Sequence, residues 1–248
     1  MKKYIAILMA VLCLFALTAC GQQVKLGAPT DYPVGGDVRS LRMLIGGADI
    51  VIEEGDSFHV ESNLKKLTVS EQNGVLTIRE DKKGGVTYTD AMLTLYVPEG
   101  TVFESVHITT GAGKLAAESL RADRLDLELG AGAVEIGYLE TTAETDIEGG
   151  AGAVIIADGS LRNLDLEMGV GELSLTAALL GENDLTLGVG ESNLTLLGGE
   201  DNYSIEIEKG LGSIMVDGQE VSRYNSRGNG QGFVEIEGGV GSVNLHFR

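Results

Sequence analysis

A Gly-x-Gly motif recurs along the second part of this 248-residue chain, and its spacing constrains the fold more than any other feature. Seven copies of the motif define the repeat, and the steps between their first glycines are 19, 20, 19, 19, 22 and 29 residues. The fourteen glycines are Gly111, Gly113, Gly130, Gly132, Gly150, Gly152, Gly169, Gly171, Gly188, Gly190, Gly210, Gly212, Gly239 and Gly241. Self-similarity at a nearly fixed period indicates a repeat architecture, in which each unit packs on its neighbours.

Apolar residues alternate on both sides of each glycine pair with the period of two that is typical of β-strands. The residue three positions before the first glycine is always apolar, as at Leu127, Ile147 and Leu166. After the second glycine the alternation resumes, for example at Val134 and Ile136. Each unit is therefore interpreted as a strand, a glycine corner, a second strand and a return.

Nineteen residues accommodate two strands of about five residues and two corners, which is too few for a propeller blade and leaves no room for a repeat helix. We predict an all-β fold, a single-stranded parallel β-solenoid (β-helix) with about 19–20 residues per coil. Glycine at the corners would supply positive φ or room for close approach between coils. An antiparallel sandwich of glycine-cornered hairpins would use the same alternation and is the alternative.

Two segments depart from the period. Residues 41–100 contain short alternating stretches joined by polar turns, and we predict that they form an irregular N-terminal β cap on the Gly-x-Gly repeats of residues 101–248. Near the other end, Gln219–Gly232 is a polar, glycine-rich insertion that is expected to be mobile. Phe233–Phe247 would then supply the last coil.

The N-terminus carries an export signature. Two lysines precede an apolar stretch at residues 4–15, which is too short for an ordinary membrane span. The tetrapeptide Leu17-Thr18-Ala19-Cys20 resembles a bacterial lipobox, although a plain cleaved signal or an uncleaved anchor is the alternative. We predict a lipoprotein signal peptide at residues 1–19, a lipidated Cys20 that anchors the protein to a bacterial membrane, and a flexible stalk over residues 20–40. The solenoid of residues 41–248 would be extracytoplasmic.

Acidic residues outnumber basic ones by 37 to 18, which gives a formal net charge of −19. A surface of this sign repels phosphate backbones, so nucleic acid is excluded as a partner. Cys13 lies within the predicted signal peptide, so Cys20 would be the single remaining cysteine and no disulfide is expected. Stability must therefore come from packing.

Carboxylates are concentrated at the outward-facing positions two and four residues before the corner glycines, where they occupy eleven of fourteen positions. The predicted acidic face contains Asp126, Glu128, Asp146, Glu148, Asp165, Glu167, Asp184, Glu206 and Glu208. Three explanations remain open. The face is solvated charge that resists aggregation, a place where carboxylates of adjacent coils share calcium, or a surface for a cationic partner such as a basic protein patch or an antimicrobial peptide. Calcium is the one cofactor considered, and no metal ligands are assigned.

Catalytic motifs are weak. Thr110–Lys114 lacks the first glycine of a phosphate loop and the Ser or Thr that follows its lysine. His59, His107 and His246 are too dispersed in the sequence to nominate a metal or triad site. Because acids recur on nearly every coil, they fit a structural rule better than a single active site. We assign no catalytic residue and predict that the protein is not an enzyme, with a calcium-dependent carbohydrate-active enzyme on a β-helix as the enzymatic alternative.

The chain resembles the putative-adhesin family of bacterial extracytoplasmic β-strand-repeat (β-solenoid) lipoproteins of unknown function. The resemblance lies in the segments Met92–Gly100, Ser105–Gly113 and Val234–Phe247 and in the repeats between them. The resemblance covers most of residues 40–248. It implies a surface-exposed solenoid, in some cases an accessory role in envelope-stress sensing, and no catalytic residues. We therefore predict a binding or scaffold module of the cell envelope with a cell-surface, cell-wall or envelope protein as partner, and an accessory of an envelope-stress sensing system as the alternative.

Overall fold

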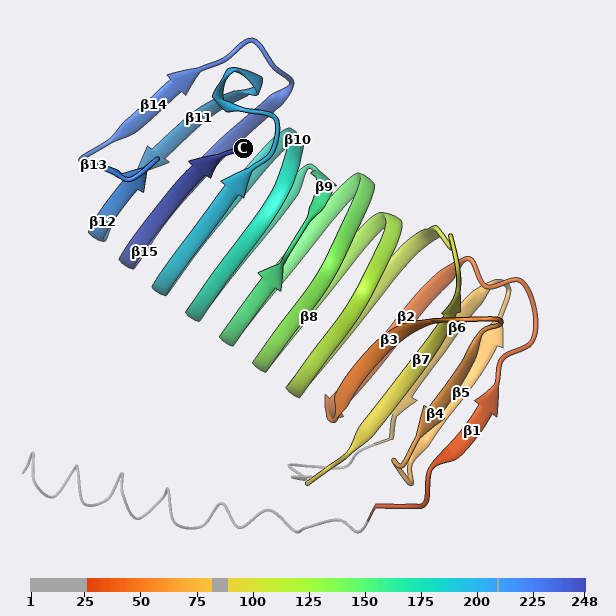
Figure 1. Cartoon of the computed structure of the whole chain (residues 1–248). Coiled ribbons are helices and arrows are strands. Elements are labelled where there is room, and N and C mark those ends of the chain that lie inside the picture. The colour runs from red at the N-terminus through yellow and green to blue at the C-terminus, as the bar shows by residue number, and fades with distance from the viewer. Residues whose placement is uncertain (1–25, 82–88, 209) are drawn as a thin grey trace, which may run out of the picture.

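The computed structural model describes residues 26–81, 89–208 and 210–248 (Figure 1). The predicted signal peptide and Cys20 lie outside the described residues. Within them the chain is almost entirely strand, and the single helical element is the short 3-10 turn η1 (Glu200–Asn202). None of the described helical structure is long and apolar enough to cross a membrane.

The centre of the molecule is a stack of coils wound by β8 (Phe103–Ile156), β9 (Gly159–Arg162) and β10 (Leu164–Leu196) (Figure 1). β10 pairs in parallel with β8, and Leu166 lies opposite Ile147 in this register. The coils of the stack are therefore parallel, in register and separated by about one repeat in sequence. The predicted β-solenoid is confirmed, and the antiparallel sandwich is excluded.

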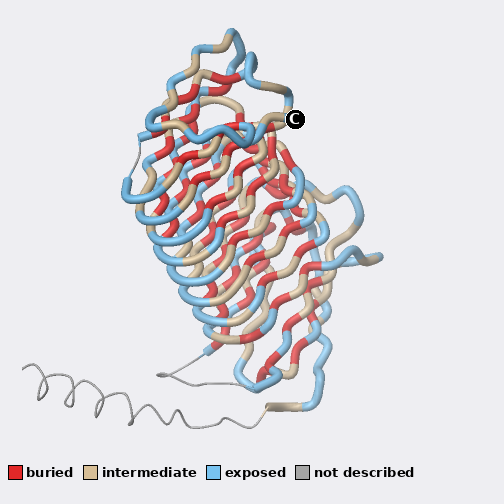
Figure 2. Tube along the Cα trace, turned by 60° about the vertical axis from the view of Figure 1, so that its left-hand side comes forward, coloured by how far each residue is buried: buried red, intermediate tan, exposed pale blue. Residues whose placement is uncertain are grey.

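Alternate side chains of each coil fill a continuous interior, which appears as the red inner positions in Figure 2. Leu127, Ile147, Leu166, Val134 and Ile136 are each at most 1% exposed. A slip of one residue in any strand would turn these side chains outward and place its neighbours inside, so burial strongly specifies the register. No buried side-chain nitrogen or oxygen in the described chain lacks a hydrogen-bond partner.

The two glycines of each corner serve different purposes, as Gly150 and Gly152 show. Gly152 has a φ of 140°, a conformation that L side chains rarely adopt. Gly150 needs no such φ, but a Cβ there would collide with the carbonyl oxygen of Gly130 on the neighbouring coil. Both predicted reasons for glycine, positive φ and close approach, are therefore present at one corner.

The first coil in sequence is not the first in space. β2 (Ser40–Gly47) and β3 (Asp49–Gly55) form one coil, and β6 (Val75–Glu80) and β7 (Met92–Pro98) form another. β2 pairs in parallel with both β6 and β8, and β3 pairs in parallel with both β7 and β8. The earlier coil therefore lies between the later coil and the central stack (Figure 1).

Residues 41–100 are more regular than the predicted cap, because they contain these two parallel coils. The irregular part consists of β1 (Thr30–Pro33), β4 (His59–Ser62) and β5 (Leu67–Gln72), which pair antiparallel with their neighbours. β1 falls within the segment predicted to be a flexible stalk. Residues 30–33 of that segment are thus part of the sheet, because their backbone pairs with β4.

The C-terminal end repeats this arrangement. β15 (Gly232–Phe247) pairs in parallel with β10 on one side, and with β11 (Tyr203–Glu208) and β12 (Leu211–Val216) on the other. The last coil in sequence is therefore the penultimate coil in space.

The insertion expected to be mobile contributes two strands to this end. They are β13 (Gln219–Val221), antiparallel to β12, and β14 (Tyr224–Arg227), antiparallel to β11. Short antiparallel strands therefore cover parallel coils at both ends of the solenoid, which limits the pairing of open edges with other chains.

Candidate functional site

The outward side chains of the first strand of each coil form two columns that run along the solenoid. The register places Asp165 beside Asp146, Glu167 beside Glu148, and Glu235 between Asp184 and Glu206. The first column is His107, Asp126, Asp146, Asp165, Asp184, Glu235 and Glu206, and the second is Thr109, Glu128, Glu148, Glu167, Thr186, Glu237 and Glu208. We call these two columns the acidic face.

All nine carboxylates predicted for this face lie on it, and each is exposed or half-exposed. One adjacency differs from the order of the sequence. Because β15 is inserted next to β10, Asp184 neighbours Glu235, and Glu206 lies one coil further away. β15 thereby adds two carboxylates, Glu235 and Glu237, to the middle of the C-terminal half of the face.

Repulsion between coils is most evident at Asp146. Burial raises the pKa of Asp146, and the charges of Asp126 and Asp165 on the neighbouring coils raise it further, followed by Glu148 and Glu144. Adjacent strands lie about 4.8 Å apart, so these carboxylates interact at short range. The centre of the face is a place where the protein itself favours an added positive charge.

Basic side chains of the protein lie at the two ends of the acidic face. At one end, His107 Nδ1 lies 2.6 Å from Asp126 Oδ2. At the other end, Arg223 Nη2 lies 2.7 Å from Glu206 Oε1. Among the described residues, the central carboxylates make no ion pair with Lys, Arg or His; these are Asp146, Glu148, Asp165, Glu167 and Asp184.

A shallow groove of about 580 Å³ follows the second column. Its walls include the side chains of Glu128, Glu148 and Glu167, and its lining continues through the first glycines of the corners, Gly111, Gly130, Gly150 and Gly169. Because glycine has no side chain, the corners leave the groove open, and the backbone of the corner glycines is accessible in it. A ligand in this groove would lie directly beside the carboxylates.

The acidic face is bordered by a row of exposed apolar side chains at the middle position of the Gly-x-Gly corners. In spatial order the row is Ala112, Ala131, Ala151, Val170, Val189, Val240 and Leu211. Val170, Val189 and Leu211 are 55%, 49% and 77% exposed. The sequence carries a signal for this row, because the residue between the two glycines is apolar in all seven corners.

These observations define a class: a parallel β-solenoid with an extended acidic surface. The chain belongs to the Toastrack DUF4097 family, whose model matches residues 38–237. The predicted membership of a family of putative adhesins with β-strand repeats is thereby confirmed. No curated protein matches the chain.

Several solved structures are similar to it. A putative adhesin from Bacteroides fragilis NCTC 9343 is 13% identical with a TM-score of 0.52, over 92% of this chain and 100% of that chain. A putative cell adhesion protein from Clostridium sporogenes ATCC 15579 is 15% identical with a TM-score of 0.40, over 90% and 100%. A putative lipid binding protein from Parabacteroides distasonis ATCC 8503 is 14% identical with a TM-score of 0.41, over 88% and 95%. At such identities the first likeness supports the fold, and the ligand has to be argued from the site.

Proposed function

We propose that this protein is a non-catalytic, adhesin-like binding module of the cell envelope, whose acidic face captures a cationic and amphipathic polypeptide. The observation that carries the proposal is the pairing of two in-register acidic columns with the adjoining apolar row. Lysine and arginine side chains of the ligand would neutralise the central carboxylates, and its apolar side chains would cover the exposed valines.

The length of the face supports a polypeptide ligand. The seven coils from His107 to Glu206 span six spacings of about 4.8 Å, or about 29 Å. An extended chain rises about 3.3 Å per residue, so some eight or nine residues of a ligand would fit along the acidic face. A single bound ion would neutralise only a small part of this surface.

The proposed setting is the outer side of a bacterial membrane, with the lipidated Cys20 as anchor and a cell-surface, cell-wall or envelope protein as partner. The basic, apolar and lipobox-like segments of residues 1–20 support this setting. The names of the similar adhesin structures are consistent with it. The negative body gains nothing from anionic headgroups, so the face would be free to meet a partner away from the membrane.

Binding of a fluorescent, lysine-rich amphipathic peptide to the full-length protein in detergent tests the proposal. The face variant combines Asp146→Asn, Glu148→Gln, Asp165→Asn and Glu167→Gln. A matched control removes four exposed charges elsewhere, by Asp37→Asn, Asp56→Asn, Glu99→Gln and Glu220→Gln. At 0.1 M salt we expect at least a tenfold loss of affinity in the face variant, and a change within about twofold in the control.

Two further results would contradict the proposal. Equal losses in the face variant and in the control would mean that only net charge matters. Millimolar calcium that stabilises the wild type but not the face variant, and abolishes peptide binding at constant ionic strength, would make the face a calcium site.

Val170→Ser with Val189→Ser should weaken peptide binding without changing its salt dependence, because these side chains contribute apolar contact and not charge.

A further inference from the structure

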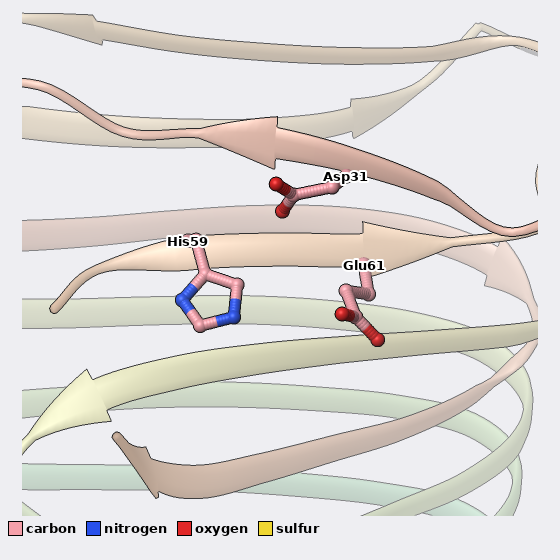
Figure 3. Close-up of side chains that lie close together, drawn as sticks. All are labelled: Asp31, His59 and Glu61. Carbon is pink, nitrogen blue, oxygen red and sulfur yellow. The ribbon is translucent and has the colours of Figure 1, made fainter. Parts of the chain in front are cut away.

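A separate group of ionisable side chains lies on the N-terminal cap, on the sheet opposite the acidic face. Asp31 comes from β1, and His59 and Glu61 come from β4 (Figure 3). The two strands are antiparallel, and their register places Asp31 directly opposite Glu61. One potential ligand atom from each of the three residues lies within 4.8 Å of those from the other two. The three histidines are dispersed in the sequence, but His59 lies close to two carboxylates, so the cluster needs no second histidine.

The imidazole of His59 is held in an orientation that suits metal ligation. Its ring stacks on Tyr96, with centroids 4.1 Å apart and planes inclined by 9°. Nδ1 lies 3.2 Å from the carbonyl oxygen of Ser57, which can only accept a hydrogen bond. Nδ1 of the neutral ring therefore carries the proton, and the lone pair is on Nε2. Metal-binding histidines commonly have their second nitrogen fixed in this way by a backbone carbonyl.

The local charge also favours a cation. Asp31 and Glu61 lie opposite each other on adjacent strands, where like charges are destabilising. Within the described chain, neither carboxylate forms an ion pair with Lys or Arg.

We propose that Asp31, His59 and Glu61 bind a divalent transition-metal ion of the zinc type. One imidazole nitrogen with two carboxylate oxygens is a donor set that suits zinc, whereas calcium takes oxygen ligands alone. Three protein ligands leave at least one coordination position for water. The site is independent of the acidic face, because it is built from other strands and other side chains.

The ion would fasten the N-terminal edge of the molecule. Among the described strands, β1 pairs only with β4, and only over the four residues Thr30–Pro33. Just before β1, the Gly27 N–H donates to the carbonyl oxygen of Asn63, and Leu26 packs against the core, so residues 26–33 together attach this segment to the solenoid. A metal ion bound by Asp31 on β1 and by two residues on β4 would therefore hold the entry point of the N-terminal segment against the cap.

Calorimetric titration of the full chain with Zn²⁺ tests the site, in a Cys13→Ser, Cys20→Ser background that removes competing thiols. We expect one equivalent to bind. His59→Phe keeps a ring that can stack on Tyr96 but removes the ligand nitrogen, and it should weaken binding by about 100-fold or more. His246→Gln is the matched control, because His246 is exposed near Asp217 without a third ligand. It should change the affinity by less than about twofold.

Hydrogen exchange of the β1 amides supplies a second readout. Zn²⁺ should slow exchange of the amides of residues 30–32 in the parent protein, and should have no effect in the His59→Phe or Glu61→Gln variants. Absence of stoichiometric binding, unchanged affinity in both variants, or binding of calcium as tight as that of zinc would each overturn the proposal. If His59→Phe fails to fold, Glu61→Gln alone decides, and it must weaken binding by at least about tenfold.

Discussion

Neutralising one carboxylate at the centre of the acidic face tests how strongly neighbouring coils repel each other. Asp146 is flanked by Asp126 and Asp165, one coil away on each side. Two unit charges separated by a coil spacing of about 4.8 Å repel by about 0.9 kcal/mol in water. A Debye length of about 10 Å at 0.1 M salt reduces this to about 0.5 kcal/mol, or about 1 kcal/mol for two neighbours. Asp146→Asn should therefore raise Tm by about 2–4 °C at pH 7.

The gain in Tm from Asp146→Asn should increase as the pH rises. The pKa of Asp146 is raised in the folded state above its ordinary value of 3.8, so the folded protein binds this proton more tightly than the unfolded chain does. The free energy of unfolding therefore falls as the pH rises from about 3.8 through the raised pKa. Wild type and variant should converge below this window and differ fully at pH 7.

Thermal unfolding followed by circular dichroism measures both effects. Glu99→Gln, an exposed turn residue outside the acidic face, is the control and should leave Tm within about 1 °C. At 1 M salt, where the Debye length is about 3 Å, the gain from Asp146→Asn should fall to a few tenths of a kcal/mol. A Tm that is unchanged or lower at 0.1 M salt, or a gain in Tm that persists in full at 1 M salt, would show that charge repulsion between coils does not destabilise the fold at Asp146.

Two other substitutions test the corners and the coil order. Gly152→Ala places a Cβ against the backbone of Gly132 at a φ of 140°, and should lower the free energy of unfolding by at least about 2 kcal/mol. At Gly35 a Cβ would contact nothing within 4 Å, so the control Gly35→Ala should change the free energy of unfolding by less than about 1 kcal/mol. Equal effects of the two substitutions in denaturant melts would show that the corner does not require glycine. Buried Asn183 accepts the Leu164 N–H and donates to the Phe233 carbonyl, so Asn183→Leu should cost about 2–4 kcal/mol and speed hydrogen exchange over residues 232–247. Unchanged exchange there would show that Asn183 does not hold the inserted coil in place.

The central solenoid could be predicted because its signals are local. A glycine pair every nineteen or twenty residues and an alternation of period two are present within each repeat, as in the segment from Leu125 to Ile136. The same alternation decides which side chains point outward. The carboxylates of the acidic face were therefore assigned to one surface without knowledge of any long-range contact.

The order of coils at the two ends could not be predicted in the same way. Every coil offers a similar parallel edge, and Ile236 pairs equally well in pattern with Leu185 and with Ile207, both of which it contacts in the sheet. The longer steps of 22 and 29 residues indicated an irregularity but not its form. Tertiary packing decides that β15 lies between β10 and β11.

The cluster of Asp31, His59 and Glu61 was missed for a related reason. It depends on antiparallel pairing between β1 and β4, whereas the local sequence of residues 20–40 predicts a stalk. A partial signal was present, because His59 and Glu61 are two residues apart and therefore share one face of a strand. The third ligand comes from a distant segment that local pattern does not connect to β4.

Zero-length carbodiimide cross-linking of a bound lysine-rich amphipathic peptide, followed by mass spectrometry, tests the proposed role of the acidic face most directly. We expect cross-links concentrated on Asp146, Glu148, Asp165 and Glu167, and we expect high salt to suppress them. Cross-links spread evenly over exposed carboxylates such as Glu54, Glu99 and Glu220, or concentrated on these, would contradict the proposed role.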